Sequence, residues 1–203
     1  MLGPAGRYAY VFSANRRQVS LFSYRQNTGP MVYERTRFGS PFQLKSEPST
    51  ANIDPGGEYM LLSKGESQTV SVYQIHALSG AIREITGSPF HTETASTEIF
   101  LPDNGNFIYG FDAAAAKLYV YPRDALSGEI GARHSSALDL SKSAISAISV
   151  QGDLLLIADK TAKTVSIYLV SPDSGGLGRI AEYKLPGNVD GMVLTTADWL
   201  DNP

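Results

Sequence analysis

His91 and Glu93 are the residues of this sequence whose types and spacing could carry acid–base chemistry. A histidine becomes a general base when a nearby carboxylate orients its ring, and a guanidinium can polarise the carbonyl of an ester that is to be hydrated. Arg16 and Arg17 supply the guanidinium, so these four residues form the predicted catalytic set. A lone histidine in a loop is often merely solvated, and a protein that binds without catalysis stays an open alternative.

A second set of polar residues could bind a ligand. Asp112 and Asp159 stand seven residues after equivalent glycines of two sequence repeats, where Lys64 and Ser13 stand in the other two repeats. Such a mixed ring could polarise a carbonyl or bind a cation, although an aspartate that ends a strand more often caps a turn. The predicted ligand-binding set is Lys64, Glu66, Asp112, Asp159 and Lys160.

Motifs for other chemistry are incomplete. His76, His91 and His134 have no metal-ligand spacing, and a chain without cysteine has neither thiolate catalysis nor a Cys-ligated zinc site. His76 and His134 are predicted to lie at a distance from the candidate site residues, so both are predicted to be structural. No Gly-X-Ser-X-Gly elbow and no glycine-rich phosphate loop occurs. We therefore expect no metal and no cofactor.

Composition narrows the possible partners. The 203 residues carry 17 basic and 20 acidic side chains, for a formal charge of −3, and no basic cluster that would attract nucleic acid. No apolar run is long enough for a membrane span. Residues 1–4 lack the basic and apolar regions of a secretory signal, which favours a cytoplasmic location over export. The absence of cysteine fits either redox compartment.

Three sequence marks recur in phase four times, and they define the elements that must position these side chains. Glycine-led hexads begin at Gly6, Gly57, Gly105 and Gly152, at spacings of 51, 48 and 47 residues. A β-rich tetrapeptide follows thirteen residues after each of these glycines, and a Ser/Thr-Gly or Gly-Gly pair comes next. A period near 48 residues with several short β-rich runs predicts an all-β fold, a β-propeller of four-stranded antiparallel blades.

The predicted strands run from the innermost, A, to the outermost, D. In the second unit they cover residues 49–54, 59–63, 69–75 and 82–86. The first unit lacks A and opens with B, C and D at 8–13, 18–24 and 31–38. The chain is thus one domain, 1–203, with blades at about 6–48, 49–95, 96–143 and 144–187 and a last inner strand at 189–197.

Four blades leave two architectures open, a closed ring latched by residues 189–197 or an open arc. An arc would expose two apolar blade faces, which favours self-association or a partner that covers them. Alternation along the strands predicts that one side of each sheet packs against the next blade. The predicted inter-blade core consists of Tyr10, Leu61, Tyr109 and Leu156 in the B strands and Leu21, Val72, Val120 and Ile167 in the C strands.

In such a meander the D–A and B–C loops emerge at one face, and the A–B and C–D turns emerge at the other. Every predicted site residue falls in the loops of the first face. We call it the loop face, and the other the turn face. His91, Lys64, Asp112 and Asp159 are therefore expected opposite Gly80.

The repeated pattern Gly-X-Tyr-X-Tyr-Val, Val-Ser-Leu-Phe or Val-Ser-Val-Tyr, Thr/Ser-Gly-X-Leu/Ile and Gly-Ser-Pro-Phe resembles the lactonase-type, or YVTN, propellers over nearly the whole chain. That family includes 6-phosphogluconolactonases and carboxymuconate cyclases, and its rings normally have seven blades. The resemblance implies a lactone or sugar-derived ligand. Glu47-Pro48-Ser49 has serine where a Pro-His pair would be looked for, so the catalytic residues of the family do not carry over.

Two function classes remain. The first is a binding scaffold that holds a small ligand or a protein partner at the loop face. The alternative is a lactone hydrolase or cyclase in which His91, Glu93 and Arg16 or Arg17 hydrate an ester carbonyl. Ring opening of sugar lactones and carboxymuconate lactones, and its loss in His91→Ala, separates the two classes.

Overall fold

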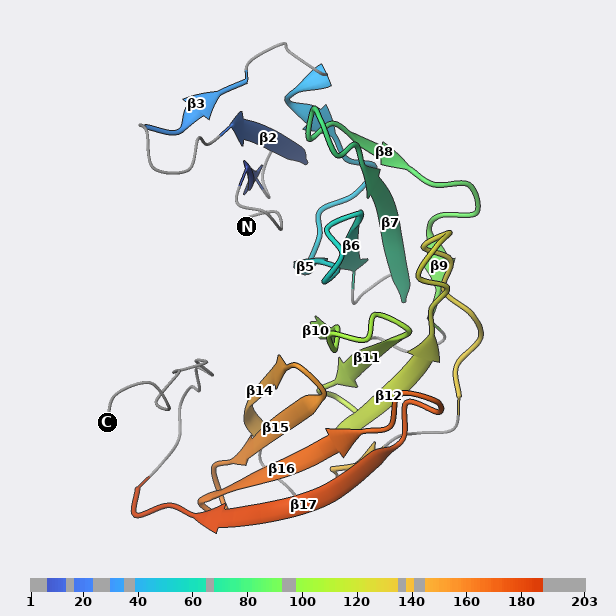
Figure 1. Ribbon diagram of the computed structural model, residues 1–203. Helices are drawn as coiled ribbons and strands as arrows, with labels where there is room; N and C mark the ends of the chain where they lie inside the picture. Colours follow the sequence, from blue (N-terminus) through green and yellow to red (C-terminus); the bar gives the residue numbers. More distant parts are fainter. Residues whose placement is uncertain are drawn as a thin grey trace, which may run out of the picture.

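The structure is a computed structural model that describes residues 7–13, 17–23, 30–34, 39–64, 68–92, 98–134, 138–140 and 145–187. These residues form four antiparallel sheets that follow one another along the chain (Figure 1). The all-β class and the blade architecture are confirmed. None of the described residues lies in a helix that could cross a bilayer.

The first two sheets match the predicted strand order. In the first blade, β1 pairs with β2, and β2 pairs with both β3 and β4. In the second blade the order is β5-β6-β7-β8, and β9 also pairs with β7. Their bounds are β1 Tyr8–Ser13, β2 Gln18–Ser23, β3 Val32–Tyr33, β4 Phe42–Gln43, β5 Thr50–Ile53, β6 Tyr59–Lys64, β7 Thr69–Ile75, β8 Ile82–Glu84 and β9 Phe90–His91.

The third and fourth sheets each have four strands in sequence order. Their bounds are β10 Glu98–Phe100, β11 Phe107–Asp112, β12 Lys117–Pro122, β13 Leu138–Asp139, β14 Ile145–Gln151, β15 Leu154–Asp159, β16 Thr164–Val170 and β17 Leu177–Lys184. Each blade from the second onward thus has an A strand, at β5, β10 and β14.

The outer strand of the first two blades is a correction to the sequence prediction, because it runs as two short pieces. The Gly-Ser-Pro part of the Gly-Ser-Pro-Phe segment lies between the pieces and its Phe begins the second piece, with a positive φ of 86° at Gly39 and 85° at Gly87. The hydroxyl of Ser40 accepts a hydrogen bond from the Leu21 amide at 3.0 Å, and Ser88 does the same for the amide of Val72. A serine side chain therefore replaces one acceptor of the missing ladder.

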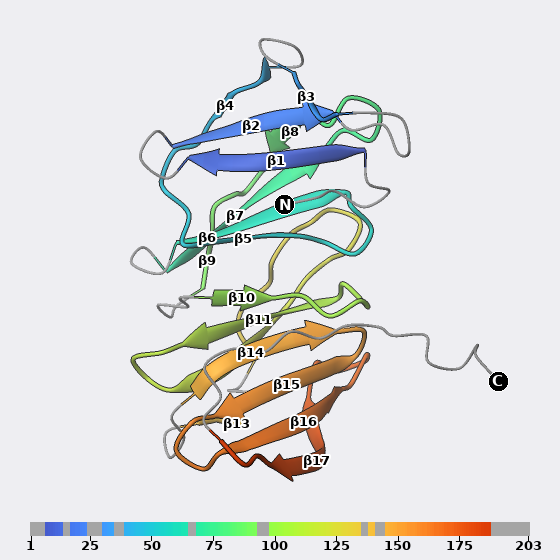
Figure 2. The same ribbon diagram turned by 90° about the vertical axis from the view of Figure 1, so that its left-hand side faces the viewer.

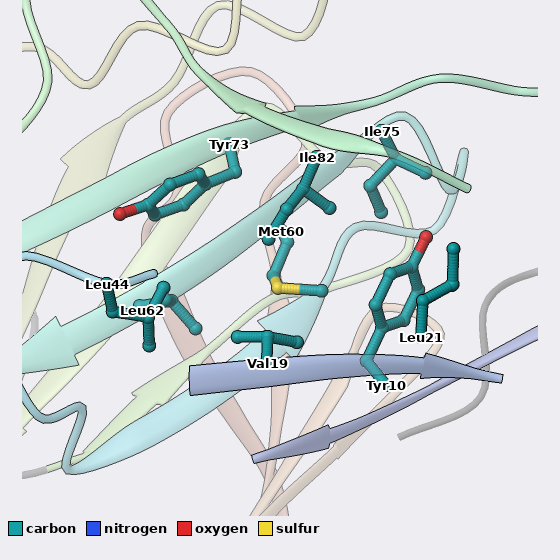
Figure 3. Close-up of a cluster of buried hydrophobic side chains, with 9 residues drawn as sticks. All are labelled: Tyr10, Val19, Leu21, Leu44, Met60, Leu62, Tyr73, Ile75 and Ile82. Atoms are coloured by element: carbon teal, nitrogen blue, oxygen red, sulfur yellow. The ribbon is translucent and has the colours of Figure 1, made fainter. Parts of the chain in front are cut away.

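Three apolar clusters lie between successive blades. The residues two and four positions after each hexad glycine mark what we call the leading face of a blade, and the opposite face is the trailing face. Figure 3 shows Val19 and Tyr10 of the first blade pointing toward Met60 of the second. The leading face of each blade packs on the trailing face of the next in all three clusters.

Six of the eight predicted core residues are buried within these clusters. Leu156 and Ile167 are the exceptions. Leu156 is buried and Ile167 is half-buried, but neither packs between blades, because both lie on the leading face of the fourth blade. Alternation predicted the side of the sheet correctly, but no further blade in the described part of the chain covers that side.

Tyrosine hydroxyls tie each blade to the turn of the next one. The Tyr10 hydroxyl donates to the Gly80 carbonyl at 2.8 Å, and the hydroxyl of Tyr109 donates to the carbonyl of Gly175. Tyr8 and Tyr59 make the equivalent bonds to the carbonyls of Leu78 and Leu126. These bonds fix the C–D turns against the preceding blade.

The close fit at these turns explains why they end in glycine. Gly128 has a φ of +79°, and a Cβ added there would lie 2.7 Å from the ring of Tyr59. Gly175 would meet the ring of Phe107 at 2.7 Å in the same way. The Ser/Thr-Gly mark therefore serves the packing of two blades as well as the turn itself.

Gly128→Ala should destabilise the chain by about 3 kcal/mol, because a left-handed alanine costs about 1–2 kcal/mol and overpacking about 1–3 kcal/mol. Urea unfolding followed by circular dichroism measures the loss. Gly56→Ala is the matched control, since its added Cβ meets nothing closer than 3.8 Å. Equal stability of the two variants would contradict the assigned packing.

Stability should fall as the pH rises above about 10, the ordinary pKa of tyrosine. Burial raises the pKa of Tyr73 to about 12 and also raises the pKa of Tyr10 and Tyr109. Above pH 10 the unfolded chain loses phenol protons that the folded chain keeps, so unfolding becomes more favourable. Urea midpoints from pH 8 to 11 measure the fall. The double variant Tyr10→Phe, Tyr109→Phe should show a shallower one.

The four blades form an open arc and not a closed ring (Figure 1). Among the described strands, none of the first sheet pairs with any of the fourth. The sheets are stacked one above the next, and the first and fourth blades are the two ends of the stack (Figure 2). The predicted inner strand at 189–197 lies outside the described residues.

Candidate functional site

The strand registers bring those predicted site residues that the structure describes to one end of the sheets. Lys64 pairs with Thr69, which in turn pairs with His91. Asp112 and Asp159 close the equivalent hairpins of the third and fourth blades. Figure 2 shows the β11–β12 and β15–β16 connections on one side and the β7–β8 and β16–β17 connections on the other. The prediction that these residues lie opposite Gly80 is confirmed.

The two aspartates at the loop face hold their own turns. The Asp112 carboxylate accepts a hydrogen bond from the Ala115 amide at 2.9 Å. Asp159 accepts two, from the amides of Thr161 at 2.8 Å and Ala162 at 2.9 Å. The alternative interpretation, that these residues cap turns, is confirmed. Within the described ranges no three acidic or histidine side chains are grouped as metal ligands.

Each B–C loop ends with a non-glycine residue in the left-handed conformation, eleven positions after the hexad glycine. These residues are Arg17, Gln68, Ala116 and Lys163, with φ between 49° and 55°. The left-handed region is costly for residues with a Cβ. In the first and fourth blades this strained position carries a cation, so a basic side chain stands at the loop face of each.

His91 lies at the end of β9 and is exposed. The next residue, Thr92, is buried, and its carbonyl accepts a hydrogen bond from the Tyr121 hydroxyl at 2.6 Å. That bond ties the strand end beside His91 to the third blade. His91 and Lys64 thus share the loop end of the second blade. Arg16, Glu66 and Glu93 lie outside the described residues.

The other two histidines have the structural roles expected of them. The Nδ1 atom of His76 accepts a hydrogen bond from the Ser79 amide at 3.2 Å within a C–D turn. His134 packs edge-on against Phe107, with ring centroids 6.2 Å apart.

A groove of about 840 Å³ lies at the turn face, between the second and third blades. Leu78 and Leu126, which line the groove, are 78% and 89% exposed, although their carbonyls accept hydrogen bonds from the hydroxyls of Tyr8 and Tyr59. Amides of Ser127 and Leu126 hold the pKa of Asp124, at the base of one turn, below its usual value. The sequence signal for this groove was the repeated Ala-Leu-Ser-Gly turn, which we assigned to the face without a site.

Arg123 and Asp54 form a buried ion pair that the sequence analysis missed. Their side chains are 1% and 6% exposed, and the guanidinium nitrogen lies 2.9 Å from the carboxylate oxygen. Arg123 also donates to the Gly105 carbonyl at 2.8 Å, and its guanidinium lies 5.1 Å from the centre of the Tyr59 ring. A usable signal existed, because Arg123 takes the repeat position that Ile75 holds in the second blade.

Comparison with known proteins identifies the family. The sequence model described as Lactonase, 7-bladed beta-propeller, matches residues 1–138. No curated protein matches the chain at a significant level. Solved structures share its fold as well, and the three that follow have sequence identities that support the fold alone.

A candidate 6-phosphogluconolactonase of Bacteroides fragilis has a TM-score of 0.70 and 16% identity, over 94% of this chain and 55% of that one. A candidate 6-phosphogluconolactonase of Bacteroides uniformis has a TM-score of 0.67 and 14% identity, over 88% and 52%. The periplasmic gluconolactonase of Pseudomonas aeruginosa has a TM-score of 0.64 and 16% identity, over 93% and 53%. The chain spans about half the length of these structures. Since the family match covers more than half of the chain, the chain belongs to the lactonase family of seven-bladed β-propellers.

Proposed function

We propose that the loop face binds a small lactone or sugar-derived molecule without converting it. The observation that carries the proposal is the strand register, which gathers Lys64 and His91 from the second blade at the same end as Arg17 and Lys160. Ammonium and guanidinium groups form charge-assisted hydrogen bonds with carboxylate and phosphate oxygens. A sugar acid or a phosphorylated sugar therefore suits this face best.

The carboxylates favour binding over catalysis. Asp112 and Asp159 accept amides of their own turns, so their oxygens hold the loop backbone in place. His91 is the described residue best suited to act as a general base. It stands at a strand end, and its predicted orienting carboxylate, Glu93, lies outside the described part of the chain.

Lys64→Ala and Lys160→Ala should each weaken binding of 6-phosphogluconate by about tenfold, since a hydrogen bond to a charged group contributes about 1.5–3 kcal/mol. Isothermal titration calorimetry measures the affinity. Arg83→Ala is the matched control, because Arg83 is an exposed cation at the turn face. No binding to the parent chain, or an equal loss in the control, would refute the assigned face.

The alternative is lactone hydrolysis or cyclisation, favoured by the family match and by the position of His91 at the loop face. Here His91 would activate water with the help of Glu93, and Arg16 or Arg17 would polarise the carbonyl. Hydrolysis of gluconolactone or a carboxymuconate lactone well above background, abolished by His91→Ala, would replace the binding proposal with this one.

A further inference from the structure

Both ends of the arc present an apolar sheet face. On the leading face of the fourth blade, Leu154 is 38% exposed and its cross-strand partner Leu169 is 49% exposed. On the trailing face of the first blade, Val11 is 50% exposed, and the rings of Phe22 and Tyr33 stack with their centroids 4.9 Å apart. Contiguous apolar surface of this kind marks an interaction site in a water-soluble domain.

The repeat positions show what each end face is built to meet. Ala9, Val11 and Phe22 occupy the positions of Met60, Leu62 and Tyr73, which pack against the leading face of the first blade. At the other end, four apolar residues lie on the leading face of the fourth blade. The residues at the same repeat positions of the first three blades pack in the clusters between blades. The four residues of the fourth blade are Leu154, Leu156, Val165 and Ile167. One end is therefore a leading face and the other a trailing face, and no blade among the described residues packs on either.

We propose that the leading face of the fourth blade binds the trailing face of the first blade in a second copy of the chain. The two faces are complementary by the rule that all three inter-blade contacts follow. They lie at opposite ends of an open arc, so they do not meet within one chain (Figure 1). Two copies related by a two-fold axis would satisfy all four end faces at once.

The resulting assembly is a ring of eight blades. A ring of eight turns about 45° per blade and a ring of seven about 51°, so the two geometries differ by only about 6° per contact. Closure of this kind removes both uncovered faces, whereas a contact that did not close would propagate into a filament.

The contact between copies lacks one component of the internal ones. Leu154 and Leu156 stand where Tyr59 and Tyr109 supply a hydroxyl to the following turn. The fourth blade therefore offers apolar area and no such tyrosine latch. We expect the two copies to separate reversibly on dilution before the blades unfold, and the association to persist in high salt.

Sedimentation equilibrium of the 203-residue chain should give a mass of about 44 kDa, twice the chain mass of 21.9 kDa. Val11→Asp and Leu169→Asp should each give monomers at the same concentration, with unchanged circular dichroism, because both side chains are about half exposed. Leu126→Asp is the matched control. It alters an 89% exposed leucine away from both end faces and should stay dimeric.

A mixture of the two monomeric variants tests the head-to-tail arrangement. In a mixed dimer, one contact joins an unaltered Leu169 face to an unaltered Val11 face, so dimers should reappear when the variants are combined. A monomeric parent chain would overturn the proposal, and so would a dimer that survives Val11→Asp. Failure of the mixture to associate would also overturn it.

Discussion

Val72→Asp should abolish cooperative folding at pH 7. Val72 is fully buried in the cluster between the second and third blades, with Leu61 and Ile108 among its members. A carboxylate there is either charged without a partner or protonated without hydrogen bonds, and in both states the apolar contacts of valine are lost. The resulting loss is a large part of the free energy of unfolding, which is roughly 5–15 kcal/mol for a domain.

Thermal melts followed by circular dichroism check this prediction. Gln74→Asp is the matched control, because Gln74 is an exposed residue of the same strand, and it should shift stability by less than about 0.5 kcal/mol. A Val72→Asp chain that melts like its parent would show that the register of β7 is misassigned.

The B and C strands could be predicted from sequence almost to the residue. The hexad glycines mark where each B strand begins, and alternation such as that of Val70 and Val72 marks the C strand. Both signals are local. The outer strands could not be predicted in this way, because the bond that replaces their ladder joins Ser40 to the amide of Leu21, nineteen residues away.

Ile167 shows a different limit. Its alternation is correct, and it lies on the same face as Leu156, but a sequence pattern assigns a side chain to a face without stating what covers that face. A closed ring and an open arc differ in whether another blade covers this face. The structure is an open arc, so the faces at its two ends do not form part of a core between blades.

The loop face was predictable because an antiparallel meander fixes which connections emerge together. The chemical role of the residues on that face was harder to predict. Asp112 and Asp159 have the residue type of a ligand site, yet their oxygens accept amides from their own loops. Whether a carboxylate serves a ligand or a turn depends on loop backbone directions, which the alternation of side chains does not encode.

Asp54→Asn should destabilise the chain by about 3–5 kcal/mol, the usual cost of removing one partner of a buried ion pair. Arg123 would keep its charge at 1% exposure, with the Gly105 carbonyl and the Tyr59 ring as its remaining partners. The asparagine oxygen can still accept the amides of Glu58 and Tyr59, which Asp54 now accepts at 2.8 Å each. The substitution therefore removes charge and leaves the turn intact.

A double-mutant cycle separates the ion pair from the packing around it. Arg123→Ile places at this position the residue that Ile75 supplies in the second blade, where it packs in an apolar cluster. Arg123→Ile alone leaves the Asp54 carboxylate buried, so it too should destabilise. With Asp54→Asn added, the buried charges are gone, and the double variant should be more stable than Asp54→Asn alone.

Guanidinium unfolding of the four chains measures the coupling. Additive losses would mean that Asp54 and Arg123 act independently, against the 2.9 Å contact between them. If the double variant recovers stability, an aliphatic side chain can replace the ion pair at this position. The other two contacts between blades use such a side chain there, Ile75 or Val170. The ion pair disfavours a shifted pairing of blades, because any other register would leave both charges buried without a partner.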